Sequence, residues 1–271
     1  MIECTYGLKK RLDFISNVIS TKNSRRILDI GCGSGANLTE HLAKKFPHSY
    51  FVGIDSDAST IAFANRNRIN NNVKYLVDHS ANDQGFFDLI IASEVIEHVE
   101  DPVEFLNSLR MRLTPMGYMV LTLPNGYGPY ELASLVETIM RLTGVYWTLH
   151  AIKKMLTKKL VILEKCDTLA ISPHINFFTY SSIRSILESS GFQITQFQSR
   201  TFLCGFGFDH LIRSRRLIKW NSRICDRMSP QLASAWMFLL APSKSLMTQS
   251  YKRGYVSQLR RFLNEKRWKL R

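Results

Sequence analysis

The chain has 271 residues, enough for one α/β domain with insertions or at most two domains. Its hydrophobic content of 45% and charged content of 21% are those of a soluble globular protein, and the longest apolar run, at 235–242, is too short to span a membrane. The five scattered cysteines form no C-x-x-C pair, which argues against a disulfide or zinc framework and favours the cytoplasm. Charged residues among the first eleven positions argue against a signal peptide.

The positive charge is concentrated near the C-terminus. The formal net charge is +14, but residues 1–203 contribute only +2, whereas residues 204–228 contribute +4 and residues 252–271 contribute +7. This basic C-terminal region is suited to contact with an anionic membrane surface or a polyanion. The alternative, which we favour, is a solvated and partly disordered basic tail at residues 244–271.

The predicted elements alternate between strands and helices. An amphipathic helix is expected over residues 6–20. Asp101 and Pro102 are expected to begin a helix that ends near Leu113. Together with the glycine-rich stretch, this order predicts a doubly wound, mostly parallel sheet that binds ligands at the carboxyl ends of its strands. The expected strands are 27–30, 50–55, 73–77, 87–93 and 118–123, and the other core helices are 36–46 and 58–69.

The pattern changes after the core at residues 25–124. Residues 125–172 are expected to form a helical cap over the substrate side, with helices at 130–142 and 146–158. The remaining expected elements, which complete a single domain at 1–243, are a helix at 181–190, a strand at 192–197, a second insertion at about 204–232 that is helical from about His210, and a strand at 233–240.

The first strand leads into a glycine loop at residues 31–35. Its glycines, Gly31, Gly33 and Gly35, remove side-chain bulk, so that backbone N–H groups can approach a ligand at the start of the next helix. Gly31-x-Gly33-x-x-Ala36 fits a relaxed dinucleotide fingerprint. Asp29 favours a different ligand, because a carboxylate there repels a pyrophosphate and attracts an ammonium or sulfonium group. A tight turn without a ligand is the third interpretation.

Acidic side chains also end the next two predicted strands. Asp55 follows Gly33 by 22 residues, and this spacing places a carboxylate where it can accept both ribose hydroxyls of a nucleoside. Asp57 is expected to cap the next helix. Asp78 ends the third predicted strand, where a turn-capping role is the alternative to ligand binding.

Several motifs occur in an order that resembles one protein family. Over residues 25–200 the chain resembles the S-adenosylmethionine-dependent methyltransferases related to the ubiquinone-biosynthesis O-methyltransferases. The resemblance implies a seven-stranded Rossmann-like sheet with helical cap insertions and methyl transfer from S-adenosylmethionine. It does not specify the acceptor. The motifs are Asp-x-Gly-x-Gly-x-Gly at 29–35, Asp55, Asp78, Phe87-Asp-Leu-Ile, Glu97-His98-Val with Asp101-Pro102, and Phe178 to Gly191-Phe192.

The same resemblance implies roles for individual residues. The glycine loop would line the methionine and ribose parts of the cofactor, and Asp29 would orient its ammonium group. Asp55 would hold the ribose hydroxyls, and Asp78 would meet the adenine. Ser93, at the end of the fourth strand, would lie near the methyl-transfer region.

Glu94, Glu97 and His98 follow the fourth strand, and they share a face if this turn is helical. In some ubiquinone-type and RNA 3′-end methyltransferases a Glu-x-x-Glu-His pattern binds a divalent metal, and His174 would then be a fourth ligand. A metal there would lower the pKa of an acceptor hydroxyl. Alternatively, the catalytic group is His98, beside Glu97, acting as a metal-free general base. A third interpretation is that Glu97 and His98 only cap and pack the next helix.

The leading functional hypothesis is a methyltransferase that O-methylates a small-molecule, glycan or lipid acceptor by in-line transfer. Docking of the segment 206–228 and the basic tail on an anionic membrane would suit a lipid acceptor. A nucleic-acid methyltransferase is an alternative, but the nearly neutral core does not favour nucleic acid. An NAD-dependent oxidoreductase is another, which Asp29 and the lack of a second mononucleotide-binding half disfavour. A non-catalytic S-adenosylmethionine-binding protein is also consistent with the motifs.

Overall fold

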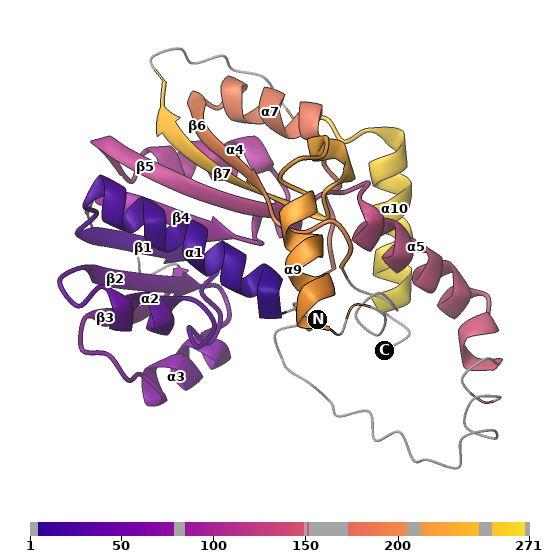
Figure 1. Ribbon diagram of the computed structural model, residues 1–271, viewed down its shortest axis with the longest axis horizontal. Coiled ribbons are helices and arrows are strands. Elements are labelled where there is room, and N and C mark those ends of the chain that lie inside the picture. Colours follow the sequence, from indigo (N-terminus) through magenta and orange to yellow (C-terminus); the bar gives the residue numbers. More distant parts are fainter. Residues whose placement is uncertain are drawn as a thin grey trace.

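The computed structural model describes residues 5–78, 85–148, 151, 173–204, 212, 214–243 and 251–268. A seven-stranded sheet forms its centre, in the order β3-β2-β1-β4-β5-β7-β6 (Figure 1). Strands β1 to β5 are parallel, and β7 runs antiparallel to both of its neighbours, which confirms the predicted mostly parallel sheet. The strands are β1 (Arg26–Ile30), β2 (Tyr50–Asp55), β3 (Val73–Val77), β4 (Phe87–Ser93), β5 (Leu113–Pro124), β6 (Phe192–Ser199) and β7 (Ala235–Pro242).

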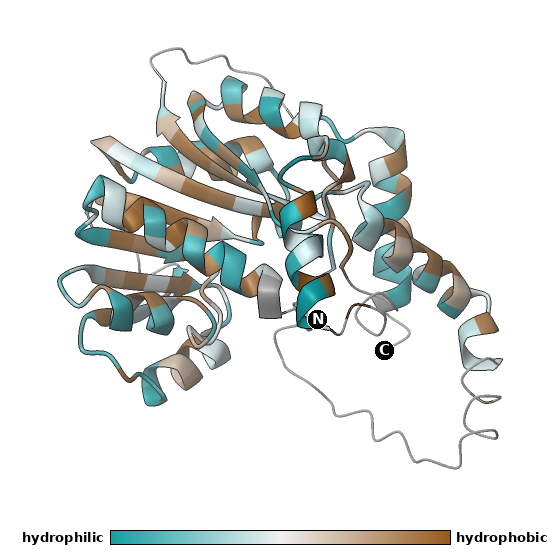
Figure 2. Ribbon diagram, viewed as in Figure 1, coloured by the Kyte–Doolittle hydropathy of each residue, from teal (hydrophilic) through white to brown (hydrophobic). Residues whose placement is uncertain are grey.

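Helices cover both faces of the sheet. Successive residues of β1 point to opposite faces, so that Ile27 packs in one core and Leu28 in the other. Figure 2 shows hydrophobic residues along the central strands, as expected for a sheet buried on both sides. One face is covered by α1 (Thr5–Lys22), α2 (Thr39–Lys45) and α3 (Ala58–Arg66), and the other by α4 (Pro102–Arg110) and α7 (Tyr180–Ser189).

Three further helices lie outside these two layers. Helix α9 (Arg215–Ile224) packs against α1. Helices α5 (Pro129–Leu142) and α10 (Tyr255–Trp268) pack against each other and lie side by side at one end of the sheet (Figure 1). Two short 3-10 turns complete the described elements, η2 (Ile96–His98) and η4 (Pro230–Leu232).

Capping residues set the starts of α3 and α4, as predicted. The Asp57 carboxylate accepts a hydrogen bond of 2.9 Å from the backbone N–H of Ser59. The Asp101 carboxylate accepts bonds of 2.8 Å and 3.1 Å from the N–H groups of Val103 and Glu104. Each cap satisfies donors that have no partner within the helix.

Several predicted boundaries were wrong. Helix α2 begins at Thr39 rather than at residue 36, because a turn links it to the glycine loop, and α3 ends at Arg66 rather than at residue 69. Strand β5 begins at Leu113, five residues before the predicted start. Its pairing with β4 shifts register between Phe87 and Leu89, so residues 114–117, which lie before the predicted strand, form an irregularity within β5.

The expectation of a solvated tail was wrong for residues 255–268. They form α10, in which Arg260 is only 4% exposed. Acidic partners offset part of the basic charge, because Arg260 pairs with Glu131 and Arg261 with Glu100. Most of the predicted helix at 146–158 and residues 205–211 of the second insertion lie outside the described residues. Within the described part of the chain, no helix combines the length and apolar character that crossing a bilayer requires.

We expect Phe238→Ala to lower the free energy of unfolding by about 3–5 kcal/mol, because it leaves a cavity in a close-packed core. Phe238 of β7 is fully buried and contacts the rings of Phe197 and Tyr180. Urea denaturation monitored by circular dichroism measures the change. Phe63→Ala is the control, because Phe63 on α3 is 50% exposed. Equal losses in the two variants would contradict the assignment of the core.

Candidate active site

β1 brings a buried acid to the start of the glycine loop. Asp29 is the penultimate residue of β1 and is only 2% exposed. Thr39 donates a hydrogen bond of 2.6 Å from its hydroxyl to Oδ2 of Asp29. Burial raises the pKa of Asp29 to about 7, although the Thr39 hydrogen bond and the charge of Arg11 act in the opposite direction. A cationic group bound beside Asp29 would therefore favour its ionised form.

The glycine loop lies close to β3 and to the turn after β4. Gly31, Gly33 and Gly35 have φ angles of 68°, 54° and 71°, in the left-handed region that favours glycine. A Cβ atom on Gly31 would lie 2.5 Å from Cγ2 of Val95, and one on Gly35 would lie 2.0 Å from the hydroxyl of Tyr75. Two of the three predicted glycines are therefore required by packing as well as by backbone conformation.

Asp55 ties the end of β2 to this loop. Its Oδ2 accepts a hydrogen bond of 2.9 Å from the N–H of Gly33, and its Oδ1 accepts one of 3.0 Å from the N–H of Asp57. Asp78 is exposed and directly follows β3, the neighbouring strand. The structure thus places Asp29, Asp55 and Asp78 at the carboxyl ends of three adjacent strands.

Ser93, at the end of β4, belongs to a network that sequence reasoning missed. Arg11 of α1 donates a bond of 2.9 Å to the Ser93 hydroxyl, which lies 3.0 Å from the Thr122 hydroxyl on β5. Thr122 donates to Oε1 of Glu94 over 2.9 Å, and Arg200 pairs with the same oxygen over 3.1 Å. Both arginines are more than nine-tenths buried. Nothing in the sequence distinguishes them from surface cations, because their partners are distant along the chain.

The condition under which Glu94, Glu97 and His98 would share a helical face is not met. The helical turn begins only at Ile96, and Glu94 has a φ of 57° outside it. Burial would raise the pKa of Glu94, but the charges of Arg200 and Arg11 and the Thr122 hydrogen bond together outweigh burial and keep that pKa below its usual value. Glu94 is therefore committed to the network at the ends of β4 and β5.

Glu97, His98 and His174 form a compact cluster. One potential ligand atom from each lies within 4.8 Å of the other two. Glu97 is 1% exposed, and within the described part of the chain neither of its carboxylate oxygens has a hydrogen-bond partner. Nε2 of His98 lies 4.0 Å from Oε1 of Glu97, and the two imidazole rings are 4.9 Å apart in an edge-to-face arrangement. Three of the four residues predicted as metal candidates are thus brought together.

Each imidazole in the cluster is held through its Nδ1. Nδ1 of His98 lies 3.1 Å from the carbonyl oxygen of Pro173, and Nδ1 of His174 lies 2.6 Å from Oε1 of Glu131. We assign Nδ1–H as the donor in both bonds, since a carbonyl and a carboxylate only accept. The segment that follows His174 is held beside Glu97 by two backbone hydrogen bonds, from the N–H groups of Ile175 and Asn176 to the carbonyl oxygen of Glu97. Nε2 is therefore the ring nitrogen that each histidine could offer to a ligand.

The pKa values in the cluster are moved in different directions. Burial raises the pKa of Glu97 to about 8. Burial, together with the charge of His174, lowers the pKa of His98 to about 4. Burial disfavours the imidazolium of His174, but the charge and hydrogen bond of Glu131, together with the charges of Glu97 and Glu94, outweigh burial and raise the pKa of His174 to about 9. At neutral pH His98 is therefore uncharged beside a cationic His174.

Glu131 is a second feature that sequence reasoning missed. It lies in the first turn of α5, is 2% exposed, and joins His174 to Arg260 of α10. The sequence carries no signal for this role, because an acid in the first turn of a helix is common and ordinarily solvated.

The chain matches a known family over most of its length. A family model described as methyltransferase domain matches residues 5–197. The ubiquinone biosynthesis O-methyltransferase of Hydrogenovibrio crunogenus is 30% identical over 128 residues, which cover 45% of this chain and 52% of that protein. The mitochondrial ubiquinone biosynthesis O-methyltransferase of Schizosaccharomyces pombe is 33% identical over 122 residues, covering 41% and 43%. The chain thus spans about half the length of the curated relatives it matches.

Solved structures share the architecture. PKMT2 from Rickettsia typhi in complex with AdoHcy aligns with a TM-score of 0.53 and 17% identity, covering 87% of this chain and 52% of that one. The plantazolicin methyltransferase BpumL, in complex with a triazolic analog and SAH, aligns with a TM-score of 0.52 and 17% identity, covering 89% and 86%. These likenesses confirm the predicted Rossmann-like fold. Because the family model spans more than half of the chain, the chain belongs to the methyltransferase domain family.

Proposed function

We propose that this chain transfers a methyl group from S-adenosylmethionine to a hydroxyl of a small-molecule, glycan or lipid acceptor, and that the Glu97–His98–His174 cluster activates that hydroxyl with a bound divalent ion. The observation that carries the proposal is the buried Glu97 carboxylate, whose two oxygens lack hydrogen-bond partners in the described structure. A buried carboxylate without partners is costly, and a cation is the partner that would stabilise its ionised form. The curated relatives named above support an oxygen acceptor.

The ends of the first four strands are the proposed cofactor site. Asp29 would attract the ammonium group, the glycine loop would admit the methionine and ribose, and Asp55 would accept the ribose hydroxyls. Asp78 would meet the adenine, and Ser93 would lie near the transferred methyl group. Asp29 also argues against a pyrophosphate at this position, so we do not favour a nicotinamide cofactor.

The donor set of the cluster fits a divalent metal. Two imidazoles and a carboxylate are common ligands of first-row metal ions. The Nδ1 atoms of His98 and His174 are already bonded to Pro173 and Glu131, as in sites where outer partners orient histidine ligands. Nε2 of each histidine and the Glu97 carboxylate would hold the ion, and the ion would displace the proton that Nε2 of His174 carries at neutral pH. A bound ion would lower the pKa of an acceptor hydroxyl, which is the chemistry that O-methylation requires.

The chain's own residues supply positioning for the transfer. The acceptor oxygen forms a bond to the methyl carbon while the bond from that carbon to sulfur breaks, and the hydroxyl releases one proton. A metal-free version of the same reaction is the second candidate. Its supporting observation is that the His98 imidazole is uncharged at neutral pH, but a pKa of about 4 makes His98 a weak base, so we favour the metal-assisted version.

The metal site is tested with Co²⁺ alone as the probe, titrated into the full chain and followed by its visible absorption. We expect Glu97→Gln to weaken Co²⁺ binding by about 100-fold or more, because the substitution removes the carboxylate ligand. Each factor of ten in affinity corresponds to only about 1.4 kcal/mol of ligand interaction. Glu104→Gln is the control, since Glu104 is an exposed carboxylate on α4. Calorimetric titration with S-adenosylmethionine should give the same affinity in all three proteins.

Two results would contradict this assignment. Unchanged Co²⁺ affinity in Glu97→Gln would remove the carboxylate from the site. Methyl transfer to screened acceptors, measured with a labelled donor, should stop in excess chelator and return with added metal. Undiminished transfer in chelator would eliminate the metal and leave His98 as the general base.

The cofactor site is tested at Gly35. We expect Gly35→Ala to weaken S-adenosylmethionine binding by about tenfold or more, since the added Cβ would collide with Tyr75 and displace the loop. Gly144→Ala is the matched control, because Gly144 also has a positive φ but no atom within 4 Å of its Cβ position. Calorimetry with NAD as the comparison ligand measures both. Equal effects of the two substitutions, or binding of NAD in preference, would overturn the loop's assignment.

We also propose that α9 touches an anionic membrane. Leu217 and Trp220 lie one turn apart on α9 and are 46% and 47% exposed. An amphipathic helix with exposed apolar side chains among basic ones suits the interface of an anionic bilayer. Such docking would bring a lipid acceptor to the enzyme. The basic residues of α9, which has no acidic residue, are Arg215, Arg216, Lys219 and Arg223.

Flotation with phosphatidylglycerol-containing vesicles tests the membrane contact. At low salt we expect the full chain to float with these vesicles and not with neutral phosphatidylcholine vesicles. The double variant Leu217→Ser, Trp220→Ser should lose most of this binding, whereas Phe63→Ser on α3 should retain it. Absence of flotation at low salt, or equal flotation of the two variants, would rule out α9 as the contact.

A further inference from the structure

Helix α10 reaches the active centre from beyond the segment that matches the family model. That segment ends at residue 197, whereas α10 comprises Tyr255–Trp268. In Figure 1 α10 lies alongside α5, the helix that carries Glu131. The side chains that α10 directs toward α5 and residues 174–177 are therefore features of this chain that the family match does not cover.

Arg260 is the most buried basic side chain of α10, at 4% exposure. Its Nη2 donates to Oε2 of Glu131 over 2.9 Å and to the Glu131 carbonyl oxygen over 3.2 Å, and its Nη1 donates to the carbonyl oxygen of Gly126. The guanidinium carbon lies 3.9 Å from the ring centroid of Phe177. Protein groups thus surround Arg260, so it acts on other residues rather than on an acceptor.

The Glu131 carboxylate links Arg260 to His174 of the cluster. Oε2 of Glu131 accepts from Arg260, and Oε1 accepts from Nδ1–H of His174 over 2.6 Å. A carboxylate bonded at both oxygens has a fixed orientation, and it fixes the imidazole plane in turn. Asn264, one turn further along α10, donates over 3.2 Å to the carbonyl oxygen of His174. Helix α10 therefore holds both the side chain and the backbone of this residue.

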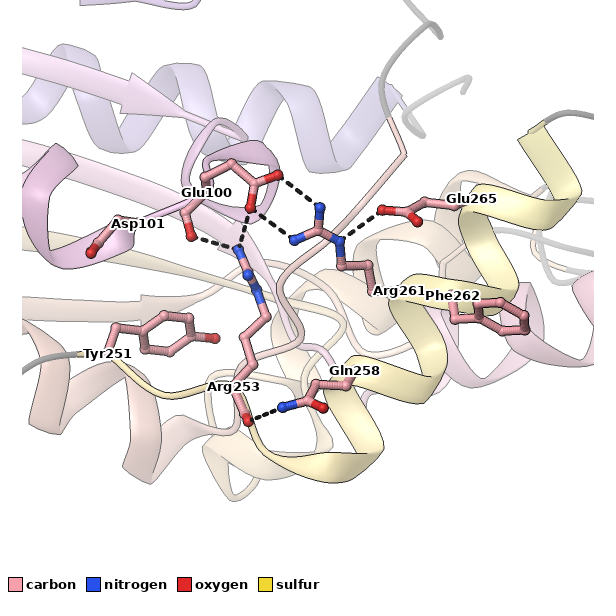
Figure 3. A pocket seen from close by; sticks show the side chains of 8 residues that line it. All are labelled: Glu100, Asp101, Tyr251, Arg253, Gln258, Arg261, Phe262 and Glu265. Atoms are coloured by element: carbon pink, nitrogen blue, oxygen red, sulfur yellow. Dashed lines mark hydrogen bonds and ion pairs between the residues drawn. The ribbon is translucent and has the colours of Figure 1, made fainter.

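A second set of contacts fastens α10 to the turn that carries Glu97 and His98. A hollow of about 320 Å³ lies between residues 100–101, which follow this turn, and residues 251–265. Figure 3 shows the side chains that line it. Within it Arg253 and Arg261 both bond to the Glu100 carboxylate, over 3.2 Å and 2.8 Å. Because these charges are paired with one another, we interpret the hollow as a junction and not as a ligand site.

We infer that Arg260 is a positioning residue of the active centre, which acts through Glu131 to orient His174 toward Glu97 and His98. The inference rests on the proposed function in one respect, namely that the oriented imidazole of His174 binds a divalent ion. Without Arg260, the buried Glu131 carboxylate loses one of its two charged partners and is free to rotate. The His174 ring then loses its fixed direction, whereas the glycine loop is left unchanged.

The test compares the wild-type chain with Arg260→Gln, Arg260→Lys and the control Arg261→Gln. Arg261 is also on α10 but pairs with Glu100 and Glu265 instead of Glu131. We expect Arg260→Gln to weaken Co²⁺ binding by about 10- to 100-fold, the usual effect of losing an outer partner of a histidine ligand. Arg260→Lys should restore part of the affinity, Arg261→Gln should keep it, and S-adenosylmethionine affinity should stay constant throughout.

A second measurement does not depend on the metal. In protein with ¹⁵N-labelled histidine, the Nδ1 proton of His174 should exchange slowly with water in the wild type and faster in Arg260→Gln. If the wild type binds no Co²⁺, the metal proposal fails and the exchange rates alone decide the role of Arg260. If Arg260→Gln does not fold, both measurements are made on Arg260→Lys. Wild-type Co²⁺ affinity together with wild-type exchange in the folded variant would overturn the inference.

Discussion

Buried carboxylates need hydrogen-bond donors or cations as partners, and this requirement determines how side chains are arranged around the candidate active site. Asp29, Glu97 and Glu131 are each no more than 2% exposed, and an ionised carboxylate is stable in such a place only with donors or cations around it. Asp29 takes a donor from α2, and Glu131 takes Arg260 from α10 together with His174. Within the described residues Glu97 has no hydrogen-bond partner, and for this reason we propose that Glu97, rather than Asp29 or Glu131, takes part in the chemistry.

The same requirement explains why elements outside the parallel core converge on the strand ends. Arg11 comes from α1, Arg200 follows β6, and Arg260 comes from α10, although they are far apart in the sequence. Each guanidinium brings several donors in a planar arrangement that suits carboxylate and carbonyl oxygens. Some basic residues near the C-terminus, such as Arg260, therefore pair with acids around the site, whereas those of α9 remain on its surface.

Much of the site was predictable because it depends on local backbone geometry. The glycine loop, Asp55 and Asp57 are positioned by neighbours within one β-α-β unit, so spacing alone indicated where they meet. Glu94 was misplaced because an i, i+3, i+4 pattern places residues on one face only if the chain is helical, and the helix starts two residues later. Arg200 and Glu131 could not be found, since a long-range ion pair leaves no periodic trace in a sequence.

The amino-acid sequence by itself determined the doubly wound sheet, the glycine loop and the acids at the strand ends, because alternating apolar runs, glycines and caps act over short distances. Its motifs also carried the resemblance to the methyltransferase family. Only the tertiary structure decided which ionisable groups meet. Glu94 lies outside the turn that carries Glu97, and His98 lies next to His174. Residues that we expected to form a solvated tail form α10, which contacts Glu131 and His174. Those outcomes depend on the burial of charge by segments distant in sequence, and burial exists only once the chain has folded.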